Sequence, residues 1–320
     1  MSLHVIVGAG PVGSTTALEL LARGHRVRLV SRSGSGPEAG GLERLRADAA
    51  DVPALLSATE GAASLYNCAN PRYDRWELDW PPIAAAMLAA AEHHRARLVT
   101  MSNLYGYGPT TGRLHPDLPL ASQGRKGRVR ARMWADAMAV HDEGRVAATE
   151  ARASDFFGPG CTDQSHLGSR AIPNLLRGRT VRFLGDPEAP HSLTYVPDVA
   201  LTLATLGTDD RAPGRAWHVP SHDTSYAAVA RRATELAGAP PARISTLPPA
   251  MLRVVGLVNP VVRELGETRY QFDRPFLIDA SDTTATFGIE PTPLDDALRA
   301  TVADWLDTAQ PVNATVAVTP

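Results

Sequence analysis

The chain has 320 residues, enough for one large α/β domain or for such a domain with a smaller lobe. A formal net charge of -2 with 21% charged residues excludes the strongly basic surface of a nucleic-acid-binding or membrane-surface protein. No apolar run is long enough to span a bilayer, and two cysteines are too few for a disulfide scaffold. There is no signal-peptide pattern and no Cys/His spacing typical of a metal site, so we expect a cytoplasmic protein that binds a small molecule and no metal.

The amino-terminal stretch carries the strongest motif. An apolar run at residues 4–7 leads into Gly8-Ala9-Gly10-Pro11-Val12-Gly13, and a helical pattern follows at residues 14–23. In this context the first glycine permits a tight turn, the second lets a pyrophosphate approach the backbone, and the third lets the helix pack closely on the strand. Phosphates bind at such a helix N-terminus because its first N–H groups have no intrahelical partner. A dinucleotide is therefore expected at Gly8, Gly10, Pro11, Val12 and Gly13, although an ordinary glycine-rich turn is the alternative.

The end of the second strand, predicted at residues 25–30, bears on the choice of cofactor. It is followed by Ser31-Arg32-Ser33, and no carboxylate occurs in this loop before Glu38. NAD-specific folds commonly have an acidic residue here for the ribose 2′-hydroxyl, whereas an Arg accommodates a 2′-phosphate. A solvated loop would also explain these residues, but Ser31 and Arg32 favour NADP over NAD.

Strands and helices alternate through the following hundred residues. The pattern predicts strands at 43–47, 63–67, 97–101 and 146–152, and helices at 53–59, 80–94 and 126–143. This alternation is typical of an α/β fold with a Rossmann-type doubly wound parallel sheet and right-handed crossovers. The residues expected to border the cofactor after the third and fourth strands are Asp48, Ala49, Cys68 and Ala69.

After residue 155 the pattern changes to short elements rich in Pro and Gly. Helices are expected near 171–177, 197–206, 225–236 and 293–307. These observations divide the chain into an NAD(P)-binding Rossmann domain at 1–155, a mostly substrate-binding lobe at 156–310, and a tail at 311–320. Some segments of the lobe are expected to return to the Rossmann sheet.

Several motifs occur together in the order typical of one enzyme family. They are the opening glycine turn, Asp48, Asn67-Cys68-Ala69, Ser102-Asn103-Leu104-Tyr105-Gly106, the stretch from Arg152 to Gly160, and Thr194-Tyr195-Val196-Pro197-Asp198. In these motifs the sequence resembles an extended or atypical short-chain dehydrogenase/reductase of the NAD-dependent epimerase/dehydratase superfamily, over nearly the whole chain. The resemblance implies a Rossmann domain, a smaller substrate lobe and an NAD(P) cofactor.

The chain departs from this family at the catalytic residues. Family members carry a Ser or Thr and a Tyr-x-x-x-Lys motif, in which the Tyr relays a proton and the Lys holds the nicotinamide ribose. No Tyr-x-x-x-Lys occurs in this sequence. Anchoring the comparison on Tyr105 places the Ser or Thr near Met101, the Tyr near Lys126 and the Lys near Arg130. Thr100 and Ser102 flank Met101 and could serve if the strand end shifts by one residue.

Lys126 is the only lysine among 32 basic residues. It is either a surface cation in the basic run 125–132 or an acid/base group whose pKa is lowered by Arg neighbours and a cofactor. Arg130 stays cationic, so it could anchor a ribose or a phosphate but could not transfer a proton. Tyr105 and Tyr107 are alternative proton donors at the mouth of the site, unless they pack beneath the loop.

Four further residues are expected near the substrate: Tyr73, Trp76, Asp155 and His191. Tyr73 and Trp76 follow the fourth strand and could equally cap the core. The resemblance places Asp155 and His191 toward the substrate lobe. It also associates the helices at 80–94 and 126–143 with a homodimer interface, for which a core-facing role is an equal alternative.

The sequence therefore predicts an NADP-dependent oxidoreductase or epimerase. Such an enzyme would act by hydride transfer on a small metabolite that bears a hydroxyl or carbonyl group, with a non-standard proton donor. Two alternatives remain open. The missing Tyr-x-x-x-Lys is also compatible with an NADP-binding sensor without turnover, and a lyase or isomerase could use the same pocket without net redox change.

Overall fold

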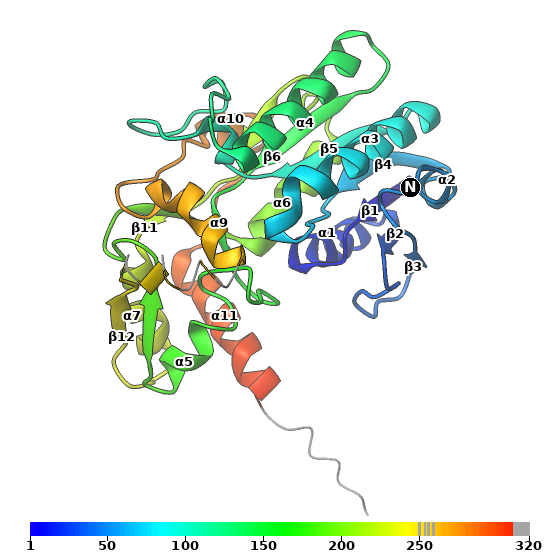
Figure 1. Ribbon diagram of the computed structural model, residues 1–320. Helices are drawn as coiled ribbons and strands as arrows, with labels where there is room; N and C mark the ends of the chain where they lie inside the picture. Colours follow the sequence, from blue (N-terminus) through cyan, green and yellow to red (C-terminus); the bar gives the residue numbers. More distant parts are fainter. Residues whose placement is uncertain (249–250, 253, 255–256, 258–259, 310–320) are drawn as a thin grey trace, which may run out of the picture.

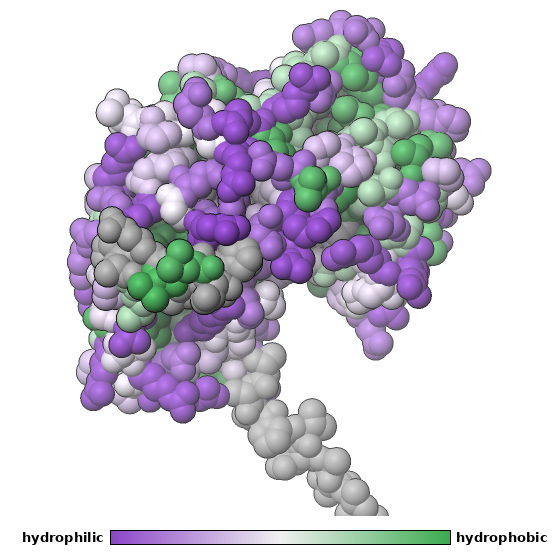
Figure 2. Space-filling view, in the orientation of Figure 1, coloured by the Kyte–Doolittle hydropathy of each residue, from purple (hydrophilic) through white to green (hydrophobic). Residues whose placement is uncertain are grey.

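The computed structural model describes residues 1–248, 251, 252, 254, 257 and 260–309. Within this part of the chain, a large α/β layer lies beside a smaller lobe (Figure 1). Figure 2 shows that the face in view is mostly hydrophilic and is notched where the two parts meet. The predicted tail at 311–320 lies outside the described residues. None of the described helices combines the length and the apolar character that a transmembrane span requires.

A seven-stranded parallel sheet forms the centre of the large layer, in the order β10-β6-β5-β4-β1-β2-β3. Its strands are β1 (Leu3–Val7), β2 (Arg26–Ser31), β3 (Leu42–Arg46), β4 (Ala62–Asn67), β5 (Arg97–Ser102), β6 (Ala148–Arg152) and β10 (Ala216–His218). The predicted Rossmann-type fold is confirmed. The strand order reverses between β1 and β4, and open α/β sheets bind ligands outside the carboxyl ends of their strands at such a point.

The edge strand β10 was not predicted, because three residues are too few to show a periodic pattern. It pairs with β6 in parallel, with Ala216 opposite Glu150 and His218 opposite Arg152. A segment from beyond residue 200 thus completes the sheet that the first half of the chain begins.

Helices cover both faces of the sheet (Figure 1). The first face carries α2 (Val52–Ala58), α3 (Trp76–His94) and α4 (Arg125–Asp142), and the second carries α1 (Pro11–Ala22) and α6 (Val196–Thr208). In β1, Val5 and Val7 join the core on the first face while Ile6 joins the core on the second. This alternation follows from the two-residue repeat of a strand that is buried on both sides. Helix α3 begins at Trp76 instead of the predicted residue 80, so that Pro81 and Pro82 lie inside it.

The smaller lobe has two sheets, with strand orders β11-β9-β7 and β12-β8. Its strands are β7 (Asp155–Phe157), β8 (Thr180–Phe183), β9 (His191–Tyr195), β11 (His222–Thr224) and β12 (Arg243–Thr246), and its helices are α5 (Ile172–Leu176), α7 (Tyr226–Leu236), α9 (Pro260–Thr268) and α11 (Leu294–Ala309). Apolar side chains of α5, α7 and α11 form a separate core. Helix α10 (Ser281–Phe287) contacts β10 of the large layer.

The chain enters the lobe directly after β6. This strand ends at Arg152, and β7 begins at Asp155, so Ser154 and Asp155 lie at the carboxyl edge of the central sheet. The chain returns through β9, whose last residue is followed at once by α6 on the large sheet. The lobe is therefore connected to the very edge at which a ligand of the large layer is expected.

A buried histidine at the start of β1 makes the stability of the large layer depend on pH. His4 is 1% exposed, and its ring nitrogens lie 2.9 Å from the Tyr66 hydroxyl and 2.9 Å from the Ser2 hydroxyl. Burial, with the positive charges of His25 and Arg97, lowers the pKa of His4 from 6.5 to about 4. The folded protein thus keeps this imidazole neutral at pH values where the unfolded chain protonates it.

We predict that the free energy of unfolding falls as the pH is lowered from about 6.5 to about 4, because the unfolded state then binds a proton that the folded state does not. In His4→Gln, an amide that does not titrate replaces the imidazole. The slope of the unfolding free energy against pH should then be shallower by up to about 1.4 kcal/mol per pH unit. Urea denaturation at a series of pH values measures this slope. The matched change His93→Gln, at an exposed position, should leave it unaltered, and an unchanged slope in His4→Gln would contradict the prediction.

Candidate active site

Backbone contacts fix the glycine turn between β1 and α1. Gly8 has a φ of +116°, and a Cβ atom there would lie 2.3 Å from the carbonyl oxygen of Cys68. A Cβ atom on Gly13 would lie 1.8 Å from the carbonyl oxygen of Gly8. By contrast, a Cβ atom on Gly10 would meet nothing within 4 Å. Two of the three glycines are thus required by the fold, and the third leaves open space beside the backbone.

This open space lies where the first turn of α1 begins. Gly10 is the N-cap residue of the helix, Pro11 follows it, and the first turn contains no acidic side chain. The N–H groups of Val12 and Gly13 have no intrahelical acceptor, so they are available to an anion. The turn therefore fits the pyrophosphate of a dinucleotide, as the sequence predicts.

The predicted cofactor residues of the next strands end at the same edge of the sheet. Ser31 is the last residue of β2, and Arg32 is exposed and forms no ion pair with any described residue. Beyond β3, Asp48 is exposed and accepts a hydrogen bond from the N–H of Ala50 at 3.0 Å. After β4, the Cys68 N–H donates to the carbonyl of Val7, which holds Cys68 and Ala69 against the glycine turn.

Tyrosine hydroxyls gather beyond the carboxyl end of β5. Ser102 ends this strand and is buried, and Tyr105 follows in a short 3-10 helix, η2 (Tyr105–Tyr107). The Tyr73 hydroxyl donates to the Tyr105 hydroxyl at 3.4 Å and lies 3.3 Å from the hydroxyl of Thr268 in α9. Burial, with Tyr73 and the charge of Asp155, raises the pKa of Tyr105 well above 10. Tyr105 is therefore a protonated phenol throughout the neutral range.

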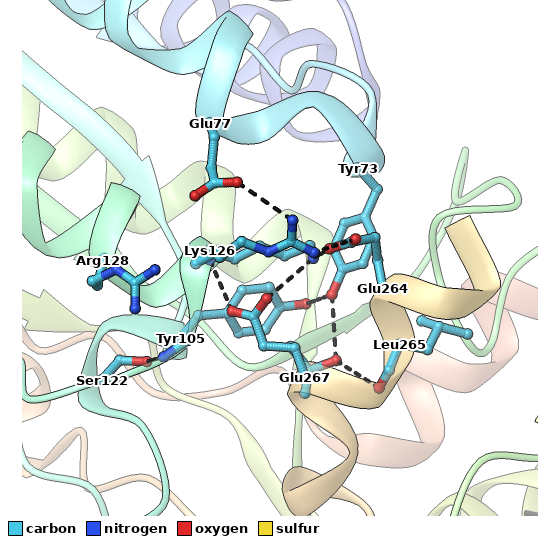
Figure 3. A network of polar contacts seen from close by, with 12 residues as sticks. Tyr73, Glu77, Tyr105, Ser122, Lys126, Arg128, Glu264, Leu265 and Glu267 are labelled. Atoms are coloured by element: carbon cyan, nitrogen blue, oxygen red, sulfur yellow. Dashed lines mark hydrogen bonds and ion pairs between the residues drawn. The ribbon is translucent and has the colours of Figure 1, made fainter. Parts of the chain in front are cut away.

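Lys126 is a buried cation held by two carboxylates, as Figure 3 shows. Its side chain is 2% exposed, and its ammonium contacts Glu264 and lies 3.5 Å from Glu267 and 4.5 Å from the centre of the Tyr73 ring. Its backbone N–H also donates to Glu267 at 2.8 Å. Lys126 thus links the start of α4 to α9, and of the two alternatives the surface cation is wrong.

Sequence reasoning did not single out Glu264 and Glu267. Both lie on α9, three residues apart and therefore on one face of the helix. Glu264 also accepts a hydrogen bond from the guanidinium of Arg125 at 2.6 Å. The three-residue spacing of these two glutamates is visible in the sequence, but no local motif connects them with residues of α4.

Arg130 lies one turn beyond Lys126 on the same face of α4. Its guanidinium stacks on the indole rings of Trp76 and Trp80, at 4.8 and 4.3 Å from their centres, and Nη1 donates to the carbonyl of Met101. Its buried Nε has no hydrogen-bond acceptor among the described residues. Burial lowers the pKa of Arg130 to about 10, so it remains a cation at neutral pH. Trp76 is itself buried against Trp80, which makes it part of the support for Arg130.

The structure separates Tyr107 from Tyr105. The Tyr107 hydroxyl lies 2.7 Å from Nε2 of His218 and accepts a hydrogen bond from Arg152 at 2.8 Å. Tyr107 is 2% exposed and packs with a different apolar cluster from the one beside Tyr105.

Asp155 and His191 meet at the junction with the lobe. Nε2 of His191 lies 2.8 Å from Oδ2 of Asp155, and the imidazole ring stacks on Phe272. Burial alone would raise the pKa of Asp155, but the hydrogen bond and charge of His191 outweigh it and lower this pKa to about 2. The Asp155 carboxylate is close enough to raise the pKa of Tyr105, so the two predicted sites adjoin one another.

We predict that Gly10→Ala abolishes dinucleotide binding but leaves the fold intact. The added methyl group meets no protein atom within 4 Å, yet it occupies the approach to the first turn of α1. Fluorescence titration with NADPH and NADH measures binding, and thermal unfolding measures stability. Gly40→Ala, where a methyl group likewise meets nothing within 4 Å, is the control and should bind normally. Undiminished binding by Gly10→Ala would refute the proposed path of the pyrophosphate.

Comparison with known proteins places this geometry in a family. Residues 4–219 match the model of the NAD dependent epimerase/dehydratase family, whereas no curated protein matches the sequence. One similar solved structure is dTDP-glucose 4,6-dehydratase from Bacillus anthracis in complex with NAD, with 17% identity, 97% of this chain and 98% of that chain covered, and a TM-score of 0.76. Another is UDP-glucuronic acid 4-epimerase from Bacillus cereus in complex with NAD, with 16% identity, 96% and 100% covered, and a TM-score of 0.77. An epimerase from Methanothermobacter thermautotrophicus has 17% identity, 96% and 93% covered, and a TM-score of 0.80.

These structures show the same fold over nearly the whole length of both chains. The family model covers more than half of the sequence and includes the glycine turn, Tyr105 and Asp155. The resemblance inferred from the sequence motifs is thereby confirmed. The chain belongs to the NAD dependent epimerase/dehydratase family and is an NAD(P)-dependent enzyme of that kind.

Proposed function

We propose that the protein is an NADP-dependent oxidoreductase or epimerase that acts on a small, uncharged metabolite bearing hydroxyl or carbonyl groups, with Tyr105 as the group that moves the proton. The observation that carries this proposal is the hydrogen bond from Tyr73 to Tyr105. Because the Tyr105 oxygen accepts this bond, its own proton remains available to a substrate oxygen. The dinucleotide, when bound, supplies the hydride chemistry.

The other two candidate donors are engaged elsewhere. The Lys126 ammonium is directed at Glu264 and Glu267 and forms ion pairs with both carboxylates. The Tyr107 hydroxyl is held by His218 and Arg152. Tyr105 is the candidate whose hydroxyl proton has no acceptor among the described residues.

The surroundings of Tyr105 support an uncharged, hydroxyl-bearing substrate. Asp155 is an ionised acceptor, and the hydroxyls of Tyr73 and Thr268 can donate or accept. The nearby positive charge of Lys126 is already balanced by the two glutamates. These groups match the hydrogen-bonding capacity of a substrate with several hydroxyl groups better than that of an anion.

The end of β2 supports NADP as the cofactor. Ser31 and the exposed Arg32 stand where a ribose 2′-substituent would approach. Among the described residues Arg32 forms no ion pair, although its charge acts on the carboxylate of Asp79. Arg130, whose Nε has no acceptor among the described residues, supports a second cationic contact to the cofactor deeper in the site.

We predict that the protein binds NADPH more tightly than NADH and that Arg32→Ala removes this preference. Loss of a charge-assisted contact to the 2′-phosphate should weaken NADPH binding about tenfold or more and leave NADH binding nearly unchanged. Fluorescence titration with both cofactors measures this, with the exposed Arg243→Ala as the charge-matched control. Equal affinities in the unaltered protein would contradict the NADP assignment without affecting the family membership.

We predict that Tyr105→Phe lowers kcat for NADPH-dependent reduction of a carbonyl compound about a hundredfold or more while NADPH binding is retained. The raised pKa of Tyr105 keeps the donor protonated, so the rate of reduction should not fall between about pH 6 and pH 9 through loss of this proton. A panel of aldehydes, ketones and keto sugars provides the substrates, and product analysis at constant NADPH absorbance detects epimerisation.

Lys126→Met tests the structural role that the two ion pairs give this residue. It should reduce stability by about 3–5 kcal/mol, because it leaves the buried carboxylate of Glu264 without its main partner. Full turnover by Tyr105→Phe, or no turnover of any compound by the unaltered protein, would refute the proposal.

A further inference from the structure

A second groove lies between α4 and the loop at 116–122, next to the edge strand β10. Its volume is about 860 Å³. Arg128, Ala135 and Met138 of α4 line one wall, whereas Lys126 and Arg130 lie on another face of the same helix. The groove is therefore separate from the candidate active site.

A buried guanidinium borders this groove. Arg152 is 2% exposed, its Nε donates to Glu150 at 2.6 Å, and its Nη1 donates to the Tyr107 hydroxyl and to the carbonyl of Pro116. Its Nη2 is buried and has no acceptor among the described residues. A buried charged donor without a partner is unfavourable, and a ligand with an acceptor oxygen would remove that cost.

The rim of the groove adds further positive charge. Arg128, Arg132 and Arg215 line it together with one acidic residue, Asp117. Arg215 pairs with Asp282 at 2.5 Å and lies 3.7 Å from Asp117, and Arg132 pairs with Asp136 on its own helix. Within the described part of the chain, Arg128 has no carboxylate partner and Nε of Arg215 has no acceptor.

The other walls are apolar. The Trp134 ring lies 5.4 Å from the guanidinium of Arg152, and the side chains of Leu118 and Met138 also line the groove. A half-buried indole beside guanidinium groups, two of which have an N–H without an acceptor among the described residues, suits a flat ring that carries an anionic group.

We propose that this groove binds a small aromatic carboxylate, whose anionic group faces Arg152 and Arg128 and whose ring lies against Trp134. The ligand is distinct from the cofactor and from the substrate, because none of the residues assigned to their binding lines the groove. The inference does not depend on the proposed reaction.

Isothermal titration calorimetry of the full chain with sodium benzoate tests this proposal, with benzamide as the neutral counterpart and inorganic phosphate as an anion without a ring. Benzoate should bind saturably, at least about tenfold more tightly than either of the others, and NADPH should not displace it. Trp134→Leu and Arg128→Gln should each weaken benzoate binding about fivefold or more, with NADPH binding unchanged. Arg231→Gln, which removes an exposed guanidinium from α7, should have no effect.

Four results would overturn the proposal. The first is the absence of any saturable heat with benzoate. The second is equally tight binding of benzamide, which would indicate an apolar groove without anion recognition. Equal binding of phosphate would indicate a site for inorganic anions. Displacement of benzoate by NADPH would place it in the dinucleotide site instead. Arg152→Met could also unfold the protein by leaving Glu150 buried and unpaired, so the two variants at Trp134 and Arg128 carry the test.

Discussion

Three backbone segments touch at the glycine turn with no side chain between them. Gly8 packs on the carbonyl of Cys68 at the end of β4, and Gly13 packs on the carbonyl of Gly8 at the end of β1. This contact fixes the position of α1 against the sheet and directs its first N–H groups across the carboxyl edge. Tyr105 after β5 and Asp155 after β6 lie at that same edge. Their distance from a bound dinucleotide therefore depends on a contact between main-chain atoms that no larger residue could preserve.

The large layer was predictable from the sequence because most of its strands are buried and helices separate most of them. Six of its seven strands were predicted, and the glycine turn is a local signal that needs no tertiary information. The strands of the lobe have three to five residues, too few for a clear period, and their pairing partners lie far away in the chain. Helix α6 was predicted as a helix, but its position against α1 on the large sheet is a tertiary fact.

The candidate site likewise has a part that was predictable from the sequence and a part that was not. The residues of the turn and the Tyr after β5 follow from local motifs, whereas the surroundings of Lys126 come from α9, 138 and 141 residues further on. A lone lysine in an arginine-rich chain suggested proton transfer, and the structure instead surrounds it with two carboxylates and a tyrosine ring. Tyr73 was expected near a substrate, yet its contacts with Tyr105, Thr268 and Lys126 make it the point where η2, α4 and α9 meet.

The late return of the chain to the first sheet has a consequence for biosynthesis. Helix α6 covers one face of the sheet and β10 forms its edge, and both follow the first strands of the lobe in the chain. While the ribosome has released only the first 155 residues, the nascent sheet lacks its seventh strand and exposes the apolar face that α6 later covers. The Rossmann layer cannot be completed as an independent amino-terminal unit, and the two parts must acquire their structure together.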